Sequence, residues 1–224
     1  MTESLSRRQL LMAAGVTGLG AADGGRGLLL PDGADAAAAG CVLQREVTEG
    51  PYYLDFDLVR RDIRGGRQGI PLTLRFAVVN STSCLAIKNA AVEIWHADAS
   101  GAYSGVAGNS GNWLRGIQRT NAGGQVRFET IFPGWYPGRT PHIHMKVFVS
   151  GNEIHTGQVF FPPAVMKSIY GRGRYSARGT VSSANANDGI YRQAGARAVL
   201  GMRRKGDTTS DGYTGSLTVG VKLS

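Results

Sequence analysis

The chain has 224 residues, of which 42% are hydrophobic and 18% are charged, a composition typical of one soluble globular domain or two small ones and not of a disordered chain. Its 33 Gly and 8 Pro favour many turns between short strands and disfavour a helical bundle. A membrane-spanning helix needs roughly 20 apolar residues, and the longest uncharged candidate, residues 10–22, has 13. We therefore expect no stable membrane span.

The first 39 residues have the pattern of an export signal. Arg7 and Arg8 precede the apolar run, and the alanine-rich residues 34–39 suit cleavage. Residues 6–11 (SRRQLL) resemble a signal for twin-arginine export, which carries folded proteins. We expect the twin-arginine machinery to export the protein and residues 40–224 to form the mature, secreted domain. The alternatives are a cytosolic protein with a basic tail and lipid attachment at Cys41.

The charge is strongly positive. Removing residues 1–39 takes away three arginines and four acidic residues, which leaves 22 basic and 12 acidic residues and a net charge of +10. A basic balance can indicate nucleic acid binding, but the basic residues are scattered and only residues 203–205 are clustered. We expect no nucleic acid partner and a weak preference for anionic surfaces or acidic aromatic substrates.

The elements expected in chain order are short strands. Residues 71–80 place Leu72, Leu74, Phe76 and Val78 on one face, the alternation of a half-buried strand. Further strands are expected at residues 91–96, 125–131, 142–149, 159–161 and 216–223, a short helix at 163–170 and long loops over 171–210. This pattern predicts an all-β fold, an antiparallel sandwich or barrel with long loops and at most one or two short helices.

The two cysteines, Cys41 and Cys84, form an even pair in a chain that we expect to be exported. Such pairs are commonly oxidised outside the cytosol. We predict a disulfide between them; the alternative is two separate buried thiols.

The sequence His142-Ile143-His144 is the most informative short motif. On a strand, residues i and i+2 point to one face, so both imidazoles project together while Ile143 enters the opposite layer. The pair is either a metal site or two packed, hydrogen-bonded histidines. A cupin site would need a Glu three or four residues further on, where the chain has apolar residues, and the next downstream carboxylate, Glu153, is too distant to support a zinc hydrolase.

Tyrosines near this motif suggest another metal chemistry. Tyr136 precedes His142 by six residues, beyond a Pro-Gly turn, and Tyr103 follows the strand expected at residues 91–96. A phenolate is a hard, strongly donating ligand that suits ferric iron. Two tyrosinates, two neutral histidines and a hydroxide would together balance the charge of Fe(III), so the whole site would be neutral.

Several segments occur in the order and spacing of a known family. They are residues 41–43 (CVL), 49–53 (EGPYY), 92–98 (VEIWHAD), 101–104 (GAYS), 133–136 (PGWY), 139–144 (RTPHIH), 156–161 (TGQVFF) and 187–191 (NDGIY). Together they resemble the intradiol ring-cleavage dioxygenases, in particular the secreted single-domain branch, over nearly all of the mature chain. The resemblance implies a β-sandwich with non-haem Fe(III) bound by Tyr103, Tyr136, His142 and His144.

The resemblance also implies roles for residues around the metal. Arg139 would lie over the substrate ring and stabilise negative charge on it, and Gln158 would be a polar partner for substrate or oxygen. Tyr52 and Tyr53 would form the pocket wall, with Tyr53 the first choice for a substrate contact. Ordinary aromatic packing is the alternative for both tyrosines and for Trp135, the tryptophan most suited to stacking on the substrate.

The activity that the resemblance implies is cleavage of a catechol by O2 between its two hydroxylated carbons, which gives a cis,cis-muconate-type diacid without NADH or flavin. Tyr136 would leave the metal and act as a base. Two other classes remain as alternatives: a secreted, non-catalytic β-sandwich that binds sugars or proteins, and a hydrolase that uses another metal.

Overall fold

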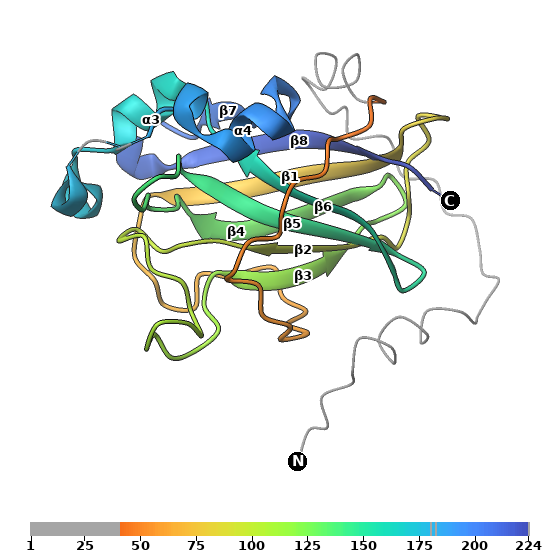
Figure 1. The fold of residues 1–224 in the computed structure, drawn as a ribbon, viewed down its shortest axis with the longest axis horizontal. Helices are drawn as coiled ribbons and strands as arrows, with labels where there is room; N and C mark the ends of the chain where they lie inside the picture. The colour runs from red at the N-terminus through yellow and green to blue at the C-terminus, as the bar shows by residue number, and fades with distance from the viewer. Residues whose placement is uncertain (1–40, 180, 182, 224) are drawn as a thin grey trace.

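Two four-stranded sheets pack face to face in the computed structural model (Figure 1), which describes residues 41–179, 181 and 183–223. The expected export signal, residues 1–39, lies outside the described residues. The all-β sandwich predicted from the sequence is confirmed. None of the helices in the described ranges is long and apolar enough to cross a membrane.

The first sheet, called the β1 sheet below, has the order β4-β1-β8-β7. Its strands are β1 (Pro71–Asn80), β4 (Gln125–Ile131), β7 (Gly201–Arg204) and β8 (Tyr213–Val221). β1 pairs with β8 in parallel, so the expectation of a purely antiparallel sandwich is wrong at this pair. A tight hairpin forces its strands to be antiparallel, whereas the long connection between β1 and β8 allows either direction.

The second sheet, called the β5 sheet, has the order β3-β2-β5-β6 and is antiparallel throughout. Its strands are β2 (Ala91–Trp95), β3 (Arg115–Arg119), β5 (His142–Val149) and β6 (Asn152–Phe160). The register aligns Arg115, Trp95, His144 and Gln158 in one row across the four strands. Side chains of one row point to the same face, so these four side chains lie together on one surface of the sheet. We call this surface the platform.

The core lies between the two sheets. Leu72, Leu74, Phe76 and Val78 are at most 1% exposed, which confirms the face expected for residues 71–80. From the β5 sheet they meet the inward-pointing residues Val92, Ile94, Ile143, Met145, Val147 and Val159. Full burial of a large aliphatic side chain contributes about 1.5–3 kcal/mol, so this layer holds the platform rigid.

Two strands of the β5 sheet were missed or shortened in the sequence analysis. β3 (RGIQR) has no apolar alternation, and it is a strand because it pairs with β2 and is covered by the chain around Ile63. β6 begins at residue 152 rather than 159, and its polar first half is held by pairing with β5. In both cases the long-range partner, and not local propensity, decides the structure.

The short helix expected at residues 163–170 is present as α3 (Pro163–Ile169). The predicted long loops at 171–210 contain more structure than expected. They hold η1 (Gly173–Arg178), η2 (Asn185–Asn187), α4 (Gly189–Ala194), η3 (Ala196–Ala198) and β7, and η4 (Thr209–Asp211) follows. α3 and α4 lie along one side of the sandwich (Figure 1).

The described chain begins at Cys41, which forms a disulfide with Cys84 (Cα–Cα 4.9 Å) in the loop after β1. From there the chain passes the end of β8, where Gln44 N–H donates to the Gly220 carbonyl, and crosses the strands of the β5 sheet rather than following them (Figure 1, orange). We call residues 47–53 the strap. It covers the outer face of the platform on which the candidate site lies.

Candidate metal centre

The two histidines lie on the outer face of β5. Their Nε2 atoms are 3.1 Å apart, and both side chains are buried. Ile143 between them is in the core cluster on the opposite face. The strand alternation expected for this motif is therefore confirmed, and it brings two imidazole nitrogens to one point.

Two phenols from loops reach the same point. Tyr103 Oη is 3.1 Å from His144 Nε2 and 3.4 Å from His142 Nε2, and Tyr136 Oη is 3.1 Å from His142 Nε2. We call Tyr103, Tyr136, His142 and His144 the donor cluster. The sequence analysis proposed these four residues as metal ligands, and the structure brings them together.

A close backbone contact joins the two tyrosine loops. Asp98 accepts hydrogen bonds from the amides of Ser100 and Ala102, which shapes the turn before Tyr103. The Gly134 amide donates to the Asp98 carbonyl at 2.7 Å, and a Cβ on Gly134 would lie only 2.6 Å from that oxygen. Only glycine allows this approach, and two residues later the loop presents Tyr136.

The donor cluster fits a cation. His142 Nδ1 is 2.7 Å from the Thr140 carbonyl, so Nδ1 carries the hydrogen and Nε2 presents a lone pair to the cluster. Burial lowers the pKa of His142 to about 3 and that of His144 well below its usual value, so both imidazoles are neutral ligands at neutral pH. Two nitrogen lone pairs and two phenol oxygens match the hard, mixed donor set that ferric iron prefers.

The pKa values of the two phenols indicate which kind of cation the donor cluster would bind. Burial raises the pKa of Tyr103 well above 10, and it also raises the pKa of Tyr136. Without a cation both phenols stay protonated at neutral pH. A highly charged ion reverses this preference because it binds the phenolate far more strongly than the phenol, which favours a trivalent metal over a divalent one.

The other histidines have different surroundings. His96 Nδ1 donates to the Ala97 carbonyl at 2.8 Å, and its Nε2 accepts from the Thr130 hydroxyl at 2.7 Å. His155 is buried on β6. Within the described part of the chain, no three residues of the types His, Cys, Asp and Glu are grouped so that they could hold a metal ion. A site there must include the phenols.

Arg139 is fixed beside the donor cluster. Its Nη1 is 3.3 Å from His142 Nε2 and 3.4 Å from Tyr136 Oη, its Nη2 donates to Gln158 Oε1 at 2.5 Å, and its Nε donates to Asp188 at 2.8 Å. These four contacts, which involve all three guanidinium nitrogens, leave the group little freedom. The structure thus places Arg139 and Gln158 together at the cluster, as the sequence analysis proposed.

Asp188 was not singled out by the sequence analysis. Its fully buried carboxylate also accepts from the Thr140 amide and caps α4 through the amides of Ile190 and Tyr191. Burial opposes ionisation, but the Thr140 amide and the Arg139 guanidinium outweigh it and hold the pKa of Asp188 below its usual value. An Asp at the start of a helix is a recognisable capping signal, but its pairing with Arg139 across 49 residues is not visible in the sequence.

Aromatic side chains surround the donor cluster. Tyr52 stacks on Tyr103 with centroids 4.6 Å apart and lies edge-on to Tyr136 at 6.1 Å. Tyr53 instead packs on Trp95 at 5.0 Å. Tyr52 therefore lies beside the donor cluster, whereas Tyr53, the first choice from the sequence for a substrate contact, lies against Trp95.

Two tryptophans differ in their relation to the site. Trp95 stacks on His144 at 4.9 Å with nearly parallel rings and so supports this imidazole. Trp135 packs against the core between the sheets.

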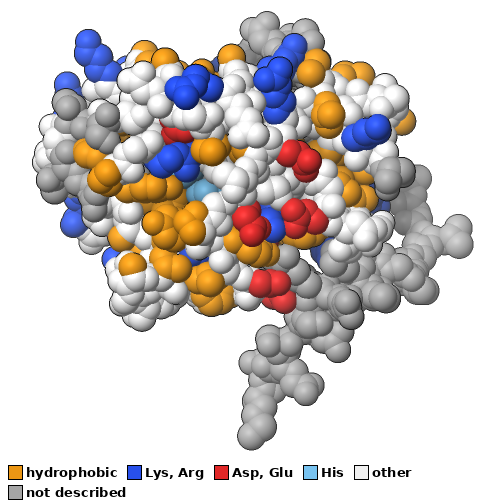
Figure 2. Space-filling model, in the orientation of Figure 1, with side chains coloured by type: hydrophobic (Ala, Val, Ile, Leu, Met, Phe, Trp, Pro, Cys, Tyr) orange, Lys and Arg blue, Asp and Glu red, His pale blue; other side chains and the backbone are white. Residues whose placement is uncertain are grey.

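Figure 2 shows the surface of the molecule in the orientation of Figure 1. A histidine side chain is visible there among hydrophobic side chains, with a basic side chain beside them.

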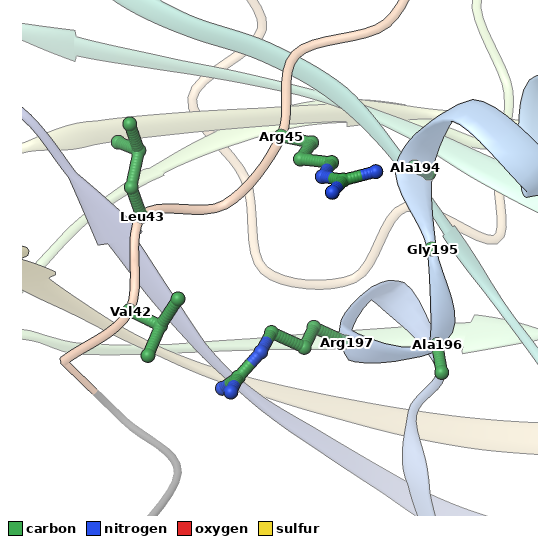
Figure 3. A pocket seen from close by; sticks show the side chains of 7 residues that line it. All are labelled: Val42, Leu43, Arg45, Ala194, Gly195, Ala196 and Arg197. Carbon is green, nitrogen blue, oxygen red and sulfur yellow. The ribbon is translucent and has the colours of Figure 1, made fainter.

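A pocket of about 370 Å³ lies elsewhere, between the chain after Cys41 and the turn that joins α4 to η3 (Figure 3). Small and aliphatic residues line it together with two arginines. No residue of the donor cluster contributes to it, and it presents no nucleophile or general base. The chemistry of this protein is therefore assigned to the donor cluster and not to this pocket.

Comparison with known proteins identifies the family of the chain. The family model described as Dioxygenase matches residues 48–169, more than half of the chain. The structure of an intradiol ring-cleavage dioxygenase from Tetranychus urticae is 35% identical, with a TM-score of 0.76 over 81% of this chain and 95% of that one. The chain belongs to the intradiol ring-cleavage dioxygenase family.

Bacterial dioxygenases are among the other solved structures that resemble this chain. The dioxygenase domain of a carbohydrate-binding fusion protein from Streptomyces sp. SirexAA-E is 27% identical, with a TM-score of 0.62 over 81% of this chain and 99% of that one. A 3-chlorocatechol 1,2-dioxygenase from Rhodococcus opacus shares the fold at 18% identity and a TM-score of 0.62, over 85% of this chain and 77% of that one. No curated protein matches the chain.

Proposed function

We propose that this intradiol dioxygenase binds Fe(III) through Tyr103, Tyr136, His142 and His144 and cleaves catechols with O2 between their two hydroxylated carbons, giving cis,cis-muconate-type diacids. The observation that supports the proposal is that two imidazole nitrogens and two phenol oxygens meet at one point. Each of these four atoms lies 3.1 Å from at least one other of the four, and the longest of the four contacts is 3.4 Å. Bound Fe(III) would supply the Lewis acidity that draws electron density from the substrate oxygens.

The two phenols have different roles in this proposal. Tyr103 is buried, whereas Tyr136 is partly exposed and lies 3.4 Å from the Arg139 guanidinium. Burial raises the pKa of Tyr136, and the positive charge of Arg139 opposes this rise only in part. Once ionised by bound Fe(III), Tyr136 Oη would be suited to take the proton of a catechol hydroxyl.

Three further residues, Arg139, Gln158 and Tyr52, would position the substrate ring or stabilise its negative charge. The Arg139 guanidinium provides a fixed positive charge that stabilises negative charge developing on the substrate ring, and no solvent has to reorganise for it to act. Gln158 is tied to the strap because its Nε2 donates to the Thr48 carbonyl at 2.9 Å. Its Oε1 accepts from Arg139, so Gln158 orients the guanidinium. Tyr52 forms an aromatic wall beside the cluster.

The first test is the visible absorption of the purified domain. Phenolate bound to Fe(III) gives a red-brown colour, and anaerobic catechol is expected to move the band to longer wavelength. Metal analysis is run on the same sample. A protein that stays colourless and iron-free after reconstitution would refute the four-ligand site and favour the secreted, non-catalytic binding module.

We further propose that residues 1–39 are a twin-arginine export signal and that the domain acts outside the cytosol. The disulfide between Cys41 and Cys84 supports an oxidising compartment. Mass spectrometry of the mature protein tests this: an unmodified N-terminus near residue 40 is expected in the culture medium. A lipid on Cys41, whose sulfur the disulfide already uses, or a full-length chain in the cytosol would contradict it.

A further inference from the structure

The strap touches the donor cluster directly. At its first residue the Val47 amide donates to the Thr156 carbonyl at 3.0 Å. At Gly50 the backbone has φ +75° and lies so close to His144 that a Cβ there would be 3.2 Å from the imidazole Cε1. Glycine, which has no side chain, satisfies both constraints. The strap therefore packs directly against His144, a candidate metal ligand.

Lys146, on the β5 sheet, contacts the strap at two places. Lys146 follows His144 by two residues and points to the same face. Its Nζ lies 2.5 Å from Glu49 Oε2 and 4.0 Å from the centre of the Tyr53 ring. Glu49 and Tyr53 are on the strap, on either side of Gly50 and Tyr52.

Lys146 is more than a surface charge. Its side chain is 7% exposed. Burial acts to lower its pKa, but Glu49 and Glu153 outweigh this and raise the pKa, so the amine is charged at neutral pH. Exposed ion pairs contribute little, whereas a shielded cation with charge-assisted hydrogen bonds is held strongly.

The two carboxylates that hold Lys146 belong to different parts of the fold. Glu153 is on β6 and pairs with Lys146 at 2.9 Å, between two strands that are already joined by backbone hydrogen bonds. Glu49 is on the strap, which is not a strand of the sheet. The Lys146–Glu49 pair therefore adds a link between the strap and the sheet that strand pairing does not supply. The side chains of Glu49 and Glu153 are equally exposed, at 45% and 44%.

We propose that Lys146 is a positioning residue that fixes the strap and thereby holds the Tyr52 ring against Tyr103, at the place where a catechol would bind. The last step rests on the proposed function, since it takes Tyr52 as a wall of the substrate site. Fixing the strap, by contrast, is a property of the fold alone. Loss of the Lys146–Glu49 pair would loosen the strap and weaken substrate binding without removing a metal ligand.

The experiment compares Glu49→Gln with Glu153→Gln. Each variant removes one carboxylate charge from Lys146 at matched exposure. Glu153 also accepts a hydrogen bond from the Thr156 hydroxyl at 2.5 Å, which the amide oxygen in Glu153→Gln can still accept, so only Glu49→Gln releases the strap. Hydrogen–deuterium exchange of the peptide covering residues 44–54 is measured in both, together with iron content, the visible band, kcat and KM for catechol. Lys146→Met, which keeps an aliphatic side chain of similar length, is the third variant.

Glu49→Gln and Lys146→Met are expected to speed exchange in the strap about fivefold and to raise KM about fivefold, the scale of a lost, partly shielded ion pair. Iron content and kcat should stay within about twofold of the parent protein, and Glu153→Gln should leave strap exchange unchanged. In the double variant Glu49→Gln/Lys146→Met the effects should not add, because both changes break one interaction.

Equal effects of Glu49→Gln and Glu153→Gln, or unchanged strap exchange in Lys146→Met, would overturn the proposal. A fall in kcat or iron content with KM unchanged would also overturn it, since that result indicates general support of the sheet. If the parent protein proves to have no iron and no activity, the proposed function fails, but the exchange measurement still decides whether Lys146 holds the strap.

Discussion

The two histidines and the two tyrosines of the donor cluster reach one point from different kinds of backbone. His142 and His144 are on β5, an inner strand of the β5 sheet, and the ring of His144 is stacked on Trp95. Tyr103 and Tyr136 are on loops that meet through a backbone contact at Gly134. One half of the site is set by strand geometry, and the other half depends on how two loops pack.

This contrast suggests a division of labour. The histidine pair is buried in a rigid layer, while Tyr136 is the member of the cluster that is partly exposed. A rigid pair suits the retention of a metal, and a partly exposed phenol suits proton transfer to and from a substrate.

The largest effect is expected for His144→Ala, which removes a ligand from the rigid half. Iron content should fall by at least about tenfold, since even changes behind a ligand weaken metal binding tenfold or more, and the red-brown band should disappear. The matched control is His155→Ala, which removes another buried imidazole of the same sheet. Retention of full iron content in His144→Ala would show that the histidines are packed residues and not ligands.

The next effect separates the two phenols. Tyr103→Phe should lose most of its iron, whereas Tyr136→Phe should lose less iron and, for each iron bound, turn over about a hundredfold more slowly, the scale of a lost general base. Metal analysis and kcat are measured on both proteins. Normal turnover and iron content in Tyr136→Phe would break the proposed role of Tyr136.

A smaller effect is expected for Asp188→Asn, which keeps the shape of the cap on α4 but removes the charge that holds Arg139. With Arg139 less well oriented, kcat should fall about tenfold while iron content is unchanged. The stability of the folded domain should fall by about 2 kcal/mol because the partly buried Arg139 guanidinium loses a charge-assisted hydrogen bond. Both quantities are measured against Asp207→Asn, an exposed aspartate outside the site.

The pH dependence of stability gives a second readout of Asp188. Its folded-state pKa is held below the usual value, so its contribution is fully present above an unfolded-state pKa of about 4. The contribution is lost as the pH falls through the lowered pKa. Urea unfolding between neutral and acid pH should therefore show a shallower acid loss in Asp188→Asn than in the parent, and identical slopes would contradict the assignment.

The smallest effect on the site is expected from Cys41→Ser/Cys84→Ser. The disulfide spans 43 residues, and closing a loop of this length stabilises by up to about 4 kcal/mol through the unfolded chain. The melting temperature should fall, while iron content, the visible band and kcat stay the same. A loss of iron in this variant would show that anchoring the strap from its far end is part of the site.

The sequence by itself determined the repeating, local features. Alternating apolar residues over 71–80 and the spacing of His142 and His144 define strand faces, because a side-chain period of two is a property of any extended backbone. The Gly- and Pro-rich composition indicated short strands and loops, and the order of the motifs identified the family. The four candidate ligands were found in this way.

Only the tertiary structure decided what depends on distant partners. β3 is a strand because β2 pairs with it, and β8 adds to β1 in parallel because a long connection leaves its direction open. The pairing of Arg139 with Asp188, the stacking of Tyr52 on Tyr103 and the ion pair of Lys146 with Glu49 all join residues far apart in the chain. Such contacts arise from the packing of the whole domain, and no local pattern encodes them.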